Sequence, residues 1–131
     1  MSAPSLAPFI LKRPWLQKWV KPLANWYVNA AGYRQLGLRA DDLIPEENDT
    51  VQLALKRLPP KDAYDRVFRL RRAFQCSVSH QLLPKNEWTK QEEDTPYLSN
   101  IIQEIEAEMK EREDLEALVV SKRAANAKSG H

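Results

Sequence analysis

The stretch Leu58–Val78, LPPKDAYDRVFRLRRAFQCSV, decides how the chain folds. Its two prolines predict the end of one helix and the start of another, because proline lacks an amide hydrogen yet fits the first helical turn. Apolar residues then recur at helical spacing and predict a buried face: Ala63, Val67, Leu70, Phe74 and Val78. Arg66, Arg69 and Arg72 line another face. We therefore expect a helix from Pro60 with an exposed basic stripe.

Toward the N-terminus, the pattern predicts a shorter helix just before these prolines. A polar residue within positions 48–50 can cap it, and it should run through Arg57. The acidic segment that follows Gly37 is expected to form a loop. Its neighbouring carboxylates, Asp41 and Asp42, point in different directions and are expected at the solvated surface.

Farther upstream, an apolar stripe rich in tryptophan predicts an amphipathic helix. The stripe consists of Leu11, Trp15, Trp19, Leu23, Trp26 and Ala30. Pro22 interrupts it, so we expect a kink or two short helices, the second beginning near Pro22 and ending by Gly32. Residues 1–14 contain three prolines and are expected to form an irregular N-terminal arm.

Toward the C-terminus, we expect a short helix that carries Trp88 and then the longest helix of the chain. Thr95 as N-cap and Pro96 at the first helical position predict its start. Its apolar stripe would be Leu98, Ile102, Ile105 and Met109. Periodicity is lost beyond Glu116, so residues 117–131 are expected to form a flexible tail.

These patterns predict an all-α fold. We expect a small helical protein of about four helices, with an extended N-terminal arm and a frayed C-terminal tail, in a single domain over residues 1–131. Three glycines against nine prolines disfavour a β-sheet. No apolar run reaches the roughly 18 to 20 residues that a membrane-spanning helix needs, so the chain is not expected to cross a bilayer.

The net charge is only +2, but the charges are strongly segregated along the chain. Basic residues occur without any acid up to Ala40, and an acidic stretch follows from Asp41 to Asp49. Basic residues dominate again from Lys56 to Arg72, and acids dominate from Lys85 to Glu116. A surface polarised in this way suits a fixed place in an assembly.

No catalytic, cofactor or metal site is predicted. Cys76 and His80 lie four positions apart, but zinc needs about four ligands and a cysteine nucleophile needs an orienting group and an oxyanion site. A packed cysteine and an ordinary histidine are expected instead. The glycines Gly32, Gly37 and Gly130 match neither the P-loop nor the dinucleotide fingerprint.

Two groups of side chains are candidate partner-binding residues. The first is Trp15, Trp19, Trp26 and Tyr27, which is more aromatic surface than one short helix usually exposes. This group could instead pack on the chain's own core or lie in a membrane interface. The second is Arg66, Arg69 and Arg72, which could contact acidic neighbours, cardiolipin or RNA. We expect no nucleic acid, because no aromatic stacking platform is interleaved with the arginines.

Several strings of sequence, in order, resemble one known family. They are NWYVNAAGY (25–33), LGLRADD (36–42), RLP (57–59), YDR (64–66), FRLRRA (68–73), HQLLP (80–84), WTK (88–90), and EED (92–94) with YL (97–98). Together they resemble the 14 kDa subunit of mitochondrial complex III, also called subunit 7 or ubiquinone-binding protein. The resemblance covers about Asn25 to Glu113.

The resemblance implies a non-catalytic accessory subunit of ubiquinol:cytochrome c oxidoreductase that supports assembly, stability and mitochondrial electron transport. It implies a helical protein peripheral to the inner membrane on the matrix side, in contact with cytochrome b and the core subunits. In that family the N-terminal region is important for assembly, and no haem ligand is implied here. Two alternatives stay open: an RNA-associated protein of the mitochondrial interior, and a carrier that binds quinone directly.

Overall fold

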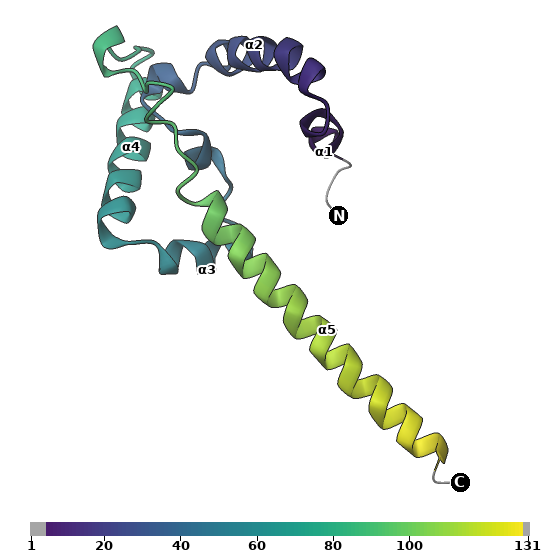
Figure 1. Cartoon of the computed structure of the whole chain (residues 1–131). Coiled ribbons are helices and arrows are strands. Elements are labelled where there is room, and N and C mark those ends of the chain that lie inside the picture. The colour runs from purple at the N-terminus through teal and green to yellow at the C-terminus, as the bar shows by residue number, and fades with distance from the viewer. Residues whose placement is uncertain (1–4, 130–131) are drawn as a thin grey trace.

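The computed structural model describes residues 5–129, and over that range it contains helices and turns but no strand (Figure 1). The elements are α1 (Ala7–Leu11), α2 (Pro14–Ala31), the 3-10 turns η1 (Arg34–Leu36) and η2 (Ala40–Leu43), α3 (Asp49–Arg57), α4 (Pro60–Val78), the 3-10 turn η3 (Lys85–Glu87) and α5 (Ser99–Ser129). The all-α prediction is therefore confirmed. Figure 1 shows α3 and α4 meeting at a corner, while α2 and α5 project from the fold in different directions.

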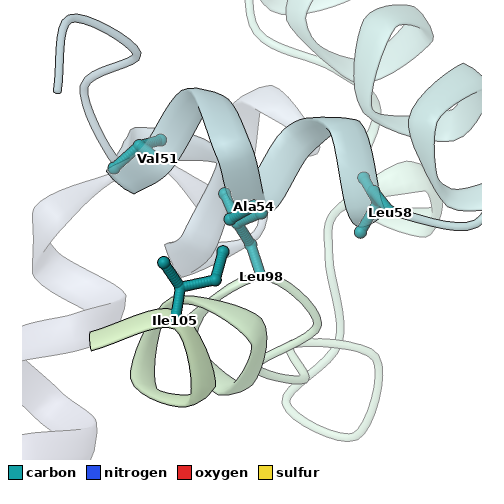
Figure 2. Packing of buried hydrophobic residues seen from close by; sticks show 5 residues of the cluster. All are labelled: Val51, Ala54, Leu58, Leu98 and Ile105. Atoms are coloured by element: carbon teal, nitrogen blue, oxygen red, sulfur yellow. The ribbon is translucent and has the colours of Figure 1, made fainter. Parts of the chain in front are cut away.

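The hydrophobic core lies where α3 packs against the start of α5 (Figure 2). Its buried members are Val51, Ala54, Leu58, Leu98 and Ile105. Burying a leucine or isoleucine side chain contributes about 1.5–3 kcal/mol, so this small cluster fixes the angle at which α5 leaves the fold. The predicted stripe is confirmed at Leu98, just before α5, at Ile105, and at Ile102, which is partly buried against the core. It is wrong at Met109, which is exposed.

Local signals placed α3 and α4 correctly. The side chain of Asn48 accepts a hydrogen bond from the Thr50 amide at 3.0 Å, which satisfies a free donor in the first turn of α3. Pro60 occupies the first turn of α4, as predicted, because that position has no intrahelical use for an amide hydrogen.

At the N-terminal end, the irregular arm and one of the two alternatives for Pro22 are wrong. The segment Ala7–Leu11 is a short helix, although residues 1–14 were expected to be irregular; residues 1–4 lie outside the described range. Helix α2 is continuous through Pro22, so the alternative of two short helices is wrong, and it ends at Ala31, before Gly32, as predicted. Proline removes a single helical hydrogen bond, and the good helix formers around it keep the remaining turns in place.

Two predictions at the C-terminal end are also wrong. Helix α5 begins at Ser99 instead of Pro96, because a distant carboxylate and not Thr95 satisfies its first amides. Over residues 117–129 the expected flexible tail is helical, and residues 130–131 lie outside the described range. Alanine, leucine and lysine in this segment favour helix even without an apolar stripe.

The largest correction concerns which side of α4 faces the fold. Arg66 and Arg69 are buried, with exposed fractions of 3% and 8%, whereas Phe74 is 73% exposed. Val67 and Val78 of the expected buried face are exposed as well. The helix is therefore rotated relative to the prediction, so that guanidinium groups point inward toward carboxylates from η2.

Candidate docking surface and the ion network that supports it

A buried carboxylate, Asp42, is the centre of the network that holds α4 to η2. Arg69 donates to both of its oxygens, at 2.6 Å from Nε and 2.9 Å from Nη2. The Arg39 amide donates at 2.9 Å, the Tyr97 hydroxyl donates as well, and Arg66 Nη1 lies 3.6 Å away. The side chain of Asp42 has 0% exposed area, so this charge is compensated entirely within the protein.

The electrostatics of this centre follow from burial and from its donors. Burial alone would raise the pKa of Asp42, but hydrogen bonds from Arg69, the Arg39 amide and Tyr97 outweigh it and hold the pKa below the ordinary 3.8. Burial and the hydrogen bond to Asp42 raise the pKa of Tyr97 above 10.0. The carboxylate therefore stays ionised and the phenol neutral at physiological pH.

Arg66 connects the same centre to two further groups. Its Nη1 donates to the Asp41 carbonyl at 3.0 Å and to the Tyr97 hydroxyl at 2.9 Å. Its Nη2 donates to Glu46 at 3.1 Å. The guanidinium of Arg66 is thus engaged inside the chain, and it presents almost no surface to a partner.

The neighbouring carboxylate, Asp41, caps α5 from a distance. Its Oδ2 accepts from the amides of Leu98 at 2.9 Å and Ser99 at 2.8 Å, and its Oδ1 accepts from the Ser99 hydroxyl at 2.7 Å. The positive end of the α5 dipole also stabilises the negative charge of Asp41 at this position. Asp41 and Asp42 were expected at the solvated surface, and that prediction is wrong because both are buried.

A second network joins the end of α2 to the segment that precedes α5. Asp94 accepts from the Tyr33 hydroxyl at 2.6 Å, from Arg34 Nη2 at 3.0 Å and from the Ala40 amide at 2.8 Å. Arg34 Nη1 also donates to Asn29, in the last turn of α2, at 3.0 Å. Burial would raise the pKa of Asp94, but these hydrogen bonds lower it below 3.8. The root of α2 is therefore held at a defined position.

Beyond that root, α2 itself has no buried residue. Its predicted partner-binding residues are all exposed, from 60% at Trp15 to 79% at Trp19, with Trp26 and Tyr27 between them. The alternative in which these side chains pack on the chain's own core is therefore wrong. Contiguous exposed apolar surface of this kind marks an interaction site, and we take α2 as the candidate docking surface.

The structure places the arginine group elsewhere. Arg66 and Arg69 belong to the buried network, and Arg72 is half-buried with its Nη2 3.3 Å from the Gly37 carbonyl. The expected exposed basic stripe is therefore wrong, and it no longer supports contacts with RNA or cardiolipin. The sequence patterns did not identify Asp42 as the buried partner of these arginines. The signal that could have identified it is a repeat of arginines at helical spacing in a chain with one separate run of acids.

Other candidate chemistry has no geometric support. Cys76 is half-buried in α4, while His80 lies past the end of the helix with a positive φ of 53°. Over residues 5–129, no group of three or more His, Cys, Asp or Glu side chains could hold a metal ion. No helix in that range is long and apolar enough to span a membrane.

Comparison with known proteins gives a consistent family assignment. Residues 14–113 match the family described as "Ubiquinol-cytochrome C reductase complex 14kD subunit". The chain is 63% identical over 122 residues to the cytochrome b-c1 complex subunit 7 of Neurospora crassa, covering 93% of this chain and 99% of that protein. It is 50% identical over 117 residues to the Saccharomyces cerevisiae subunit 7, covering 89% and 92%. The Pongo abelii subunit 7 is 47% identical over 97 residues, covering 74% and 86%.

Proposed function

The chain belongs to the 14 kDa subunit family of the ubiquinol–cytochrome c reductase complex, and from this premise we propose that it is a non-catalytic accessory subunit of mitochondrial complex III. In this role it supports electron transport from ubiquinol to cytochrome c by stabilising the assembled complex. It lies at the matrix side of the inner membrane, peripheral to the bilayer.

The observation that carries the proposal is the exposed aromatic face of α2. Three tryptophans and a tyrosine on one helix are not buried by the fold of this chain and remain exposed to solvent. Large aromatic side chains supply much of the binding energy in protein interfaces. We propose that α2 docks on the membrane subunit cytochrome b.

Helix α5 offers a second surface for the core subunits. Beyond Met109 it projects from the fold, and its outer half exposes the apolar residues Leu115, Leu118, Val119 and Val120. These residues lie between charged side chains of both signs, including Glu111, Arg112 and Arg123. Such a mixed surface fits a soluble protein partner better than a lipid one.

The mechanism is linkage by mass action. A subunit that binds assembled cytochrome b, and not its unfolded or unassembled forms, shifts the equilibrium toward the assembled state. No reacting group is needed for this role. The chain acts through the surfaces that it presents and through the rigidity with which it presents them.

The test replaces Trp26 by alanine in the organism that makes the protein, and follows complex III by blue-native electrophoresis with mass spectrometry. We expect the chain to comigrate with cytochrome b and cytochrome c1, and Trp26→Ala to lower the amount of complex III. Tyr64→Ala is the matched control, because it removes an equally exposed aromatic from α4. An unchanged amount of complex III with Trp26→Ala would reject α2 as the anchor.

Migration of the wild-type chain apart from both cytochromes would reject the proposal as a whole. The two alternatives then have separate readouts. An RNA-associated protein would appear in a ribonucleoprotein fraction and lose its RNA steeply with salt. A quinone carrier would show quenching of tryptophan fluorescence in the isolated folded chain.

A further inference from the structure

The N-terminal helices carry one sign of charge only. Residues 5–40 contain no acid, and α1, α2 and the turn between them hold Lys12, Arg13, Lys18 and Lys21. Among the residues that the structure describes, none of these four cations has an ion-pair partner. Arg13 stacks on the Phe9 ring, with its guanidinium carbon 4.3 Å from the centroid. The positive charge of this segment is therefore not used by the fold.

The lysines of α2 lie beside and behind the face that its tryptophans form. With 3.6 residues per turn, Trp15, Trp19 and Trp26 fall within about 40° of one another. Lys18 lies about 80° to one side of their centre, and Lys21 lies about 140° away on the opposite half of the helix. A helix with an aromatic apolar face and a lysine-containing polar face is typical of segments that lie in the plane of a membrane interface. Tryptophan rings and lysine ammonium groups are both stabilised at that depth.

Pro22 favours the interface over the hydrocarbon interior. Because proline has no amide hydrogen, it cannot donate to the carbonyl oxygen of Lys18 one turn earlier. An unpaired carbonyl costs several kcal/mol in hydrocarbon but is readily hydrated at the headgroup level. The sequence of α2 is thus suited to a wet and charged boundary.

We propose that the basic side of α1–α2 binds the phosphate groups of anionic phospholipid while the aromatic face packs against cytochrome b. The inference rests on the proposed function, since docking on a membrane subunit brings α2 to the bilayer surface. It assigns a lipid-binding role to Lys12, Arg13, Lys18 and Lys21, and none to the buried arginines of α4.

The test uses the purified full-length chain and sedimentation with vesicles. Phosphatidylcholine vesicles provide the neutral surface, and the same vesicles with added cardiolipin, or with phosphatidylglycerol at equal charge, provide the anionic ones. Each basic residue near an anionic surface raises the partition coefficient about fivefold, so the double substitution Lys18→Gln and Lys21→Gln should lower it roughly 25-fold. Replacing Lys56 and Lys61 by glutamine removes the same charge from α3 and α4 and should leave the partition coefficient unchanged.

Three outcomes would overturn the inference. One is equal binding to neutral and anionic vesicles, and another is an equal loss in the Lys56 and Lys61 control. The third is displacement of the chain by inorganic phosphate beyond the effect of a neutral salt at the same ionic strength, which would make free phosphate the ligand.

Failure of the inference is distinguishable from failure of the proposed function. If the Lys18 and Lys21 variant binds anionic vesicles normally while Trp26→Ala still lowers complex III, the lipid site is wrong and the docking helix stands. If Trp26→Ala has no effect on complex III, the docking helix is wrong whatever the vesicles show.

Discussion

The network around Asp42 gives the sharpest prediction about stability. Replacing Asp42 by asparagine keeps the shape of the side chain but removes the charge that compensates the buried Arg69, while the buried Arg66 keeps its pair with Glu46. Leaving a buried ion without its partner costs about 3–5 kcal/mol. Since small domains have only about 5–15 kcal/mol of stability in total, the variant should lose a large part of it.

The structure also predicts an asymmetry between the two ends of this ion pair. Without the Arg69 guanidinium, Asp42 keeps the Arg39 amide, the Tyr97 hydroxyl and Arg66. We therefore expect Arg69→Met to cost less, about 1–3 kcal/mol, because the carboxylate that remains is still hydrogen-bonded.

The assay is urea unfolding of the purified chain, followed by circular dichroism, for the two single variants and the double variant. Glu108→Gln is the control: it breaks the bidentate pair with Arg57, in which both side chains are exposed, and should change the free energy of unfolding little. The double variant should be more stable than the sum of the single losses implies. An Arg69→Met cost equal to or larger than that of Asp42→Asn would refute the role of Asp42 as the centre of the network.

Two further predictions concern the stability of the fold at low pH and the effect of replacing a glycine. Because hydrogen bonds hold the pKa of Asp42 and Asp94 below 3.8 in the folded state, their contribution is complete above the unfolded pKa and is lost as the pH falls through the folded pKa. The urea midpoint of unfolding should therefore fall as the pH is lowered below about 4, and this fall should be less steep in the Asp94→Asn variant. Gly37→Ala should destabilise more than Gly32→Ala in thermal unfolding: both glycines have positive φ, but only at Gly37 would a Cβ lie 2.1 Å from Arg72 Nη2.

Local chemistry could be predicted from the sequence because its partners are close in the chain. The Asn48 cap acts on an amide two residues away, and Pro60 sets its own backbone angle. The tryptophans of α2 were also identified correctly as exposed candidates for a partner surface, because an aromatic excess on one short helix exceeds what a small core can absorb. Their role in binding stays a prediction.

The orientation of α4 could not be predicted, and the reason is geometric. Apolar residues and arginines both recur at the helical period, so the spacing gives two faces without indicating which one points inward. The decision depends on Asp42, which lies 27 residues from Arg69 along the chain. The neighbouring carboxylates do diverge, since Asp41 turns to α5 and Asp42 to α4, but both reach buried sites and not water.

The buried ion pairs fix the direction in which the exposed helices leave the fold. Asp94 holds the end of α2, Asp42 holds α4, and Asp41 caps α5, so three aspartates fix the directions of three helices. A surface whose direction is fixed before binding loses less conformational freedom when it docks, and it therefore binds more tightly for the same contact area. This explains why a chain with so small a core commits two buried arginines to internal ion pairs. They add little net stability over an apolar replacement, but they fix α4 on η2, the turn from which Asp41 caps α5.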